Sequence, residues 1–204
     1  MERWLYLIAD FSCGEGALRE SLAAGIDYIQ LREKDITSAE YLRRARKLRE
    51  MTAGFDVKLI INDRLDIAML CDADGVHLGQ SDIPVGDARK LLGAGKIIGA
   101  TAKTVEQARQ AALDGADYLG SGAWFPTETK KDAVPISEQV YRAILQETHI
   151  PNVAVGGITA ENCRKPLECG ATGLAISAGI LKAESPASEI AKIRECLGEF
   201  CRDR

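Results

Sequence analysis

Lys58-Leu59-Ile60-Ile61-Asn62-Asp63-Arg64 is the stretch that decides the fold. A short apolar, β-branched run stops abruptly and gives way to an amide, a carboxylate and a guanidinium. This pattern is typical of a buried parallel strand whose carboxyl end opens into a site, because ligands of α/β folds bind at those ends. A strand followed by an ordinary polar turn explains one such segment equally well. The chain repeats the pattern, and the repetition favours the first interpretation.

Eight short apolar runs alternate with longer amphipathic stretches along the chain. The expected strands are Leu5–Ala9, Tyr28–Leu31, Leu59–Asn62, Gly75–Leu78, Ile97–Ala100, Tyr118–Gly120, Val153–Val155 and Leu174–Ser177. The clearest expected helices are Ala39–Met51, Val105–Leu113, Glu138–Glu147 and Ser188–Phe200. This alternation predicts an α/β fold, a single (β/α)8 TIM barrel that forms one catalytic domain over residues 1–204. A doubly wound open sheet is the alternative. Polar groups follow nearly every strand, whereas an open sheet concentrates its site at one switch point, so the barrel is favoured.

Composition excludes several classes of protein. The 204 residues are 46% hydrophobic and 27% charged, which suits a soluble globular domain. A net charge of −4 without a basic tract argues against nucleic acid as a partner. No apolar run approaches the roughly 18 residues of a membrane helix, so we expect no membrane partner and a cytoplasmic location. Six cysteines without a C-x-x-C pair, and only two histidines, give poor support for a zinc site.

Three polar side chains share one face at the end of the second expected strand. In an extended chain residues i, i+2 and i+4 point the same way, so Gln30, Arg32 and Lys34 lie together. An amide, a guanidinium and an ammonium suit a multiply charged oxyanion such as pyrophosphate. The alternative is a solvated turn in which Arg32 and Lys34 pair with Glu33 or Asp35.

Two carboxylates follow the third and fourth strands. Asp63 and Asp82 are candidate Mg²⁺ ligands, since Mg²⁺ takes oxygen ligands and often only one or two carboxylates plus phosphate oxygens. Asp82 has an alternative role as the cap of a helix begun by Ile83-Pro84. His77 lies among apolar residues and is expected to pack rather than to act. The hydroxyl of Thr101, after the fifth strand, either contacts a phosphate or leaving group or caps a turn.

The last three strands lead into segments that suit phosphorylated ligands. Thr127, Thr129 and Lys130 lie in a loop whose composition fits closure over such a ligand. Gly156-Gly157 and Ser177-Ala178-Gly179 follow the seventh and eighth strands, where barrels often bind phosphate through backbone N–H groups. The residues therefore predict two anion sites, and an enzyme that joins or rearranges two phosphorylated small molecules.

Taken together, the motifs resemble those of the thiamine phosphate synthase family, in family order and over nearly the whole chain. They are Gln30-Leu31-Arg32-Glu33-Lys34, Ile61-Asn62-Asp63-Arg64 with Asp66, Asp74-Gly75-Val76-His77-Leu78-Gly79-Gln80 with Asp82, Gly115-Ala116-Asp117-Tyr118, Thr127-Glu128-Thr129-Lys130 and Val155-Gly156-Gly157-Ile158. The resemblance implies coupling of 4-amino-2-methyl-5-pyrimidinylmethyl diphosphate to a thiazole phosphate, giving thiamine phosphate and pyrophosphate. It also implies Mg²⁺ as cofactor and a dissociative mechanism, in which pyrophosphate leaves before the thiazole nitrogen attacks.

The same resemblance implies a role for each site residue. The pyrimidine diphosphate would be held by Gln30, Arg32, Lys34, Asn62, Thr101 and Lys130, of which Arg32, Thr101 and Lys130 would be catalytic. Asp63 and Asp82 would bind Mg²⁺. The thiazole phosphate would be held by Thr127, Thr129, Gly157, Ser177 and Ala178. Two positions depart from the family: Thr101 replaces the usual Ser, and the extra Gly179 leaves open whether Ile176-Ser177 or Ser177-Ala178 forms the last phosphate contact.

Two other functions compete with this interpretation. A thiazole tautomerase-like enzyme shares the barrel and the phosphate site but would need a histidine base, and it would not need the diphosphate cluster. A non-catalytic sensor of a phosphorylated ligand is the second, and no regulatory domain is visible to support it. The expected partners are two phosphorylated small-molecule substrates. The sequence leaves the oligomeric state open, a homo-oligomer included, along with the choice between a carboxylated and a non-carboxylated thiazole.

Overall fold

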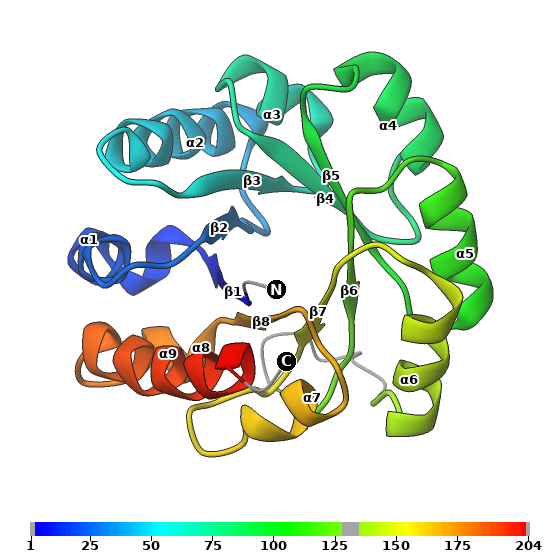
Figure 1. Cartoon of the computed structure of the whole chain (residues 1–204). Coiled ribbons are helices and arrows are strands. Elements are labelled where there is room, and N and C mark those ends of the chain that lie inside the picture. Colours follow the sequence, from blue (N-terminus) through cyan, green and yellow to red (C-terminus); the bar gives the residue numbers. More distant parts are fainter. Residues whose placement is uncertain (1–2, 128–134, 203–204) are drawn as a thin grey trace.

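A computed structural model describes residues 3–127 and 135–202 of the chain. Eight parallel strands form a closed barrel in sequence order, and β1 pairs with β8 to close it (Figure 1). The strands are β1 (Trp4–Ala9), β2 (Tyr28–Leu31), β3 (Lys58–Asn62), β4 (Gly75–Leu78), β5 (Ile97–Thr101), β6 (Tyr118–Ser121), β7 (Asn152–Val155) and β8 (Gly173–Ile176). The predicted (β/α)8 barrel is confirmed, and the open-sheet alternative is wrong.

The helices form a ring around the strands, and α9 packs against α1 where the ring closes. They are η1 (Phe11–Cys13), α1 (Glu15–Ala23), α2 (Ser38–Thr52), α3 (Leu65–Leu70), α4 (Val85–Leu92), α5 (Val105–Leu113), α6 (Glu138–Glu147), α7 (Arg164–Glu168), α8 (Ala178–Leu181) and α9 (Pro186–Arg202). Thr37, Thr104 and Ser137 begin α2, α5 and α6, each by accepting the amide N–H three residues on. Within the described ranges, no helix is long and apolar enough to cross a membrane.

Side chains alternate between two layers because neighbouring residues of a strand point to opposite faces of the sheet. The outer layer packs the sheet against the helices and includes Leu5, Leu7 and Ile29, all fully buried. The inner layer fills the barrel and contains Tyr6 and Tyr118. The eighth strand ends at Ile176, one residue earlier than predicted, since Ser177 turns out of the strand to begin α8.

A polar contact ties the barrel strands together in pairs at their amino ends. The residue just before each even-numbered strand accepts the N–H of a residue on the preceding strand. The pairs are Asp27 with Leu5 (2.6 Å), Asp74 with Leu59 (2.8 Å), Asp117 with Ile98 (2.7 Å) and Thr172 with Asn152 (3.2 Å). Arg49 adds an ion pair to Asp74 at 2.7 Å, and Arg89 adds one to Asp117 at 2.6 Å. These contacts lie at the end of the barrel that serves stability in this fold.

We expect Asp117→Ala to lower the free energy of unfolding by about 1–3 kcal/mol, the usual cost of leaving a buried donor without its partner. The Ile98 N–H would lose its acceptor and Arg89 would lose its ion pair. Urea unfolding measures the change. Asp87→Ala is the matched control, because the one ion pair of Asp87 within residues 3–127 and 135–202 is the exposed one with Lys90. Equal stability of the two variants would contradict a stabilising role for Asp117.

Candidate active site

A cavity of about 880 Å³ opens among the carboxyl ends of the strands. Every predicted site residue within the described ranges lines it, from the strands β2, β3 and β5 and from the segments that follow β2, β3, β4, β6, β7 and β8. These residues are Gln30, Arg32, Lys34, Asn62, Asp63, Asp82, Thr101, Thr127, Gly157, Ser177 and Ala178. Thr129 and Lys130 lie outside the described residues, so their assigned roles stay predictions.

Arg32 and Lys34, the two cations after β2, do not pair with Glu33 or Asp35 in a solvated turn, which was the alternative. Lys34 Nζ lies 2.7 Å from Asp63 Oδ2, across to the end of β3, and not beside Glu33 or Asp35. Arg32 lines the cavity and forms no ion pair with any carboxylate among residues 3–127 and 135–202. A guanidinium that faces a cavity in this way is available to bind an oxyanion through two parallel hydrogen bonds.

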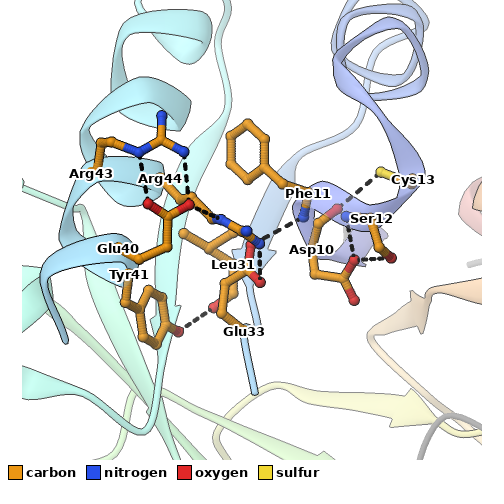
Figure 2. Close-up of polar contacts among 10 residues, drawn as sticks. All are labelled: Asp10, Phe11, Ser12, Cys13, Leu31, Glu33, Glu40, Tyr41, Arg43 and Arg44. Atoms are coloured by element: carbon orange, nitrogen blue, oxygen red, sulfur yellow. Dashed lines mark hydrogen bonds and ion pairs between the residues drawn. The ribbon is translucent and has the colours of Figure 1, made fainter. Parts of the chain in front are cut away.

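Glu33, between the two cations, points the other way and anchors the segment (Figure 2). Its side chain is only 4% exposed. One carboxylate oxygen accepts the Phe11 N–H at 3.0 Å and the other pairs with Arg44 of α2 at 2.8 Å. Arg44 is itself held by Glu40 at 2.7 Å. The segment after β2 is therefore fixed from behind, and Arg32 and Lys34 are directed to the cavity side.

Asp63 and Asp82 lie against each other at the cavity wall. The two carboxyl groups share a hydrogen bond, and Asp63 adopts a left-handed backbone conformation with φ of 62°. Burial, together with the Asp63 carboxyl, raises the pKa of Asp82. Burial is the largest influence on Asp63 and acts to raise its pKa, but the hydrogen bonds with Lys34 and Asp82 and the charges of Lys34 and Arg32 together outweigh it and lower that pKa. The two acids are thus held in one small site with opposite shifts in pKa.

Asp82 does not cap the following helix, so that alternative is wrong. Its Oδ2 accepts the Gly79 N–H at 2.6 Å, which turns the carboxyl back towards Asp63. Helix α4 begins at Val85, with Pro84 in the cap position and no side-chain cap. No group of three or more His, Cys, Asp or Glu side chains in the described ranges could hold a metal. Two adjacent carboxylates still fit Mg²⁺, which commonly completes its shell with water and substrate phosphate oxygens.

The turns after β7 and β8 form another part of the cavity wall. Gly156 and Gly157 have φ of 101° and 64°. A Cβ on Gly157 would lie 2.5 Å from the Pro126 carbonyl oxygen, so only glycine fits beside the loop after β6. Asn162 Nδ2 donates to the Gly157 carbonyl at 2.9 Å and holds the turn. Ile176, Ser177 and Ala178 all line the cavity, so both alternatives for the last phosphate contact stay open.

Several cavity residues had no expected role. Tyr6, Lys103 and Lys182 line the cavity although they belong to none of the motifs, and Tyr118 lines it although its motif carried no chemical role. His77 also faces the cavity instead of packing among apolar side chains. Its Nδ1 lies 3.0 Å from Tyr118 Oη and its Nε2 3.0 Å from Thr101 Oγ1. Strand alternation was the signal that could have found it, because the register places His77 beside Gly99 and Asn62 on the neighbouring strands.

Fold and cavity together define a (β/α)8-barrel protein with a cavity lined by cations, two carboxylates and glycine turns at the carboxyl ends of its strands. Residues 5–180 match the family model described as Thiamine monophosphate synthase, and the chain belongs to that family. It is 47% identical over 194 residues to a thiamine-phosphate synthase of Clostridioides difficile, covering 92% of each chain. A relative of the same description from Moorella thermoacetica is 42% identical over 202 residues, 96% of each chain. The solved thiamine phosphate pyrophosphorylase of Pyrococcus furiosus superimposes with a TM-score of 0.88 at 35% identity, covering 97% of this chain and 96% of that one.

Proposed function

We propose that this protein condenses 4-amino-2-methyl-5-pyrimidinylmethyl diphosphate with a thiazole phosphate, giving thiamine phosphate and pyrophosphate, in the cytoplasm and with Mg²⁺. One observation carries the proposal. A single cavity is lined by the cationic segment after β2, by the Asp63–Asp82 pair and by the glycine turns after β7 and β8. Two substrates with separate phosphate groups fit such a divided site. The family of the chain supplies the identity of the two substrates.

The reaction asks the protein to stabilise charge and to position two molecules. We infer a dissociative course in which the bond from the methylene carbon to the diphosphate oxygen breaks first. The thiazole nitrogen then attacks the methylene carbon, and pyrophosphate takes the bonding electrons. Charge grows on the leaving oxygens, so donors fixed beside them contribute most to the rate. Mg²⁺ held by Asp63 and Asp82 would supply further charge neutralisation there.

The described side chains divide into groups by their place in the cavity. Arg32 and Thr101 would donate to the diphosphate, and Lys34 would add its charge while it orients Asp63. Gln30 and Asn62 are only 3% and 7% exposed and would bind the edge of the pyrimidine. Backbone N–H groups at Gly157 and at the Ser177 turn would hold the thiazole phosphate, with Thr127 beside them. Holding both molecules in one orientation accounts for the rest of the acceleration.

A tautomerase-like reaction is disfavoured by the state of the cavity histidine. Such a reaction needs a ring nitrogen that is able to take a proton from substrate. Both ring nitrogens of His77 are engaged, by Tyr118 and by Thr101. His149, the second histidine of the chain, is not among the residues that line the cavity.

The test is an assay of the purified protein with both substrates, with and without Mg²⁺. We expect thiamine phosphate and pyrophosphate to form in equal amounts and only when Mg²⁺ is present. Offering the thiazole phosphate with and without its carboxylate settles which form is used. Isomerisation of the thiazole without coupling would support a tautomerase instead. Binding of either substrate without any product would support a sensor, and both results would contradict the proposal.

A further inference from the structure

A chain of four hydrogen bonds crosses the interior of the barrel below the cavity. Gln30 Nε2 donates to Tyr6 Oη at 2.9 Å, and Tyr6 Oη lies 2.8 Å from Tyr118 Oη. Tyr118 Oη lies 3.0 Å from His77 Nδ1, and His77 Nε2 lies 3.0 Å from Thr101 Oγ1. The five residues come from β2, β1, β6, β4 and β5, and all line the cavity. The two ends of the chain are residues assigned above to the diphosphate substrate.

One order of donors and acceptors gives each tyrosine hydroxyl proton of this chain an acceptor within the chain. The Gln30 amide donates to Tyr6, so the single Tyr6 hydroxyl proton goes to its other partner in the described structure, Tyr118. Tyr118 then accepts from Tyr6 and gives its own proton to His77 Nδ1. Burial raises the pKa of Tyr6 and of Tyr118, so both hydroxyls keep their protons at neutral pH.

The order continues through the histidine to Thr101. A neutral imidazole whose Nδ1 accepts carries its proton on Nε2, and that proton is donated to Thr101 Oγ1. Thr101 Oγ1 is then an acceptor on the histidine side. Its own proton has no acceptor on another residue in the described ranges and turns to the cavity. A hydroxyl held in this way is a donor fixed before substrate arrives.

The backbone of the barrel leaves room for the chain at two inward-facing glycines. A Cβ on Gly99 would lie 2.1 Å from Cζ of Tyr118. A Cβ on Gly120 would lie 3.0 Å from Cε1 of His77. Any larger residue at these positions would displace one of the two rings. The two glycines therefore make room for the rings of Tyr118 and His77. Aliphatic side chains could fill the same space without burying polar groups that need hydrogen-bond partners.

We propose that His77 is a positioning residue, locked by the Tyr118 hydroxyl as the Nε2–H tautomer, which aims the Thr101 hydroxyl proton at the leaving diphosphate. The proposal rests on the proposed function. His77 itself neither accepts nor gives up a proton during the reaction. The His77 Nε2–H donates to Thr101 Oγ1, which leaves the Thr101 hydroxyl proton to point at a diphosphate oxygen. Negative charge grows on that oxygen as the diphosphate leaves. Fixed donors at such oxygens act without reorganising during the reaction.

The tautomer can be measured without any activity. The chain has only two histidines, so ¹⁵N chemical shifts of the full-length protein identify His77 once His149→Gln removes the other signal. We expect an unprotonated Nδ1 and a protonated Nε2 at neutral pH. Tyr118→Phe removes the donor to Nδ1 and should shift the signals towards a mixture of tautomers. A wild-type ring with its proton on Nδ1, or with both nitrogens protonated, would overturn the proposal.

Kinetics then test whether His77 acts through Thr101. We expect His77→Leu and Thr101→Val each to lower kcat by about 10- to 100-fold, somewhat less than loss of a direct oxyanion donor, with little change in KM. The double variant should be no slower than Thr101→Val alone, because the histidine then has nothing left to position. His77→Gln, whose amide nitrogen can replace Nε2 as donor, should recover most of the activity and is also the variant to use if His77→Leu fails to fold.

Effects of His77 and Thr101 that multiply in the double variant would overturn the proposal, since independent losses indicate a merely structural histidine. So would a His77→Gln variant as slow as His77→Leu at unchanged melting temperature. A wild-type protein that forms no thiamine phosphate refutes the proposed function instead. In that case the ¹⁵N measurement still decides whether the tautomer is locked.

Discussion

Asp63→Asn should lower Mg²⁺-dependent turnover by about 100- to 1,000-fold at saturating substrates. A bound divalent ion contributes several kcal/mol to the stabilisation of charge on a phosphoryl group. Each 1.36 kcal/mol or so corresponds to a tenfold change in rate. Asparagine keeps the shape of the side chain but loses the charge that faces both Lys34 and Asp82. Mg²⁺ would then have one carboxylate ligand in place of two.

Initial rates over a range of Mg²⁺ concentrations measure this effect. Asp82→Asn should show the same loss, because it removes the other member of the pair. Asp66→Asn is the matched control: its carboxylate is three residues along the chain, is 58% exposed and pairs with Arg64. Thermal unfolding should show all three variants folded. Turnover of Asp63→Asn near that of the wild type would contradict the assignment of this pair to Mg²⁺.

The fold could be predicted because the apolar pattern of the strands and the start signals of the helices agree with each other. The run 59–61 is apolar on both faces, as a strand between a helix layer and a filled barrel must be. Thr104 with Gln107 signals the start of α5, and the structure has that cap. The site followed from the fold, since eight parallel strands bring their carboxyl ends to one rim. Residues separated by about 30 positions, such as Lys34 and Asp63, therefore meet.

What could not be predicted depends on contacts between strands that are far apart in the sequence. His77 follows an apolar neighbour and reads as a core residue, and its role depends on Tyr118 from β6. A local rule also gave the wrong alternative for Asp82, because Asp before Ile-Pro is a good helix cap. In the structure the Asp82 carboxyl contacts the Gly79 N–H and the Asp63 carboxyl instead of the first N–H groups of α4. Glu33 is a third example, since its partner Arg44 lies 11 residues away on α2.

Arg32→Ala should cost about 100- to 1,000-fold in kcat, the range typical for loss of one donor to a developing oxyanion. Arg32 lines the cavity and forms no ion pair with a carboxylate among the described residues. Its planar group can donate two parallel hydrogen bonds to a diphosphate, and a lysine ammonium cannot reproduce that geometry. Arg32→Lys should therefore recover only part of the rate. Steady-state kinetics with both substrates varied give the values.

Inhibition by the product separates loss of anion binding from general damage to the barrel. If the cavity has two anion sites, Arg32→Ala should raise the inhibition constant of pyrophosphate and leave the KM of the thiazole phosphate unchanged. Those two ligands would bind at different parts of the wall, one beside β2 and one at the turns after β7 and β8. Arg43→Ala is the control, because Arg43 lies on the exposed side of α2 and pairs with Glu40. Equal weakening of both ligands would argue against two sites, because removal of a side chain beside β2 should weaken only the ligand bound there.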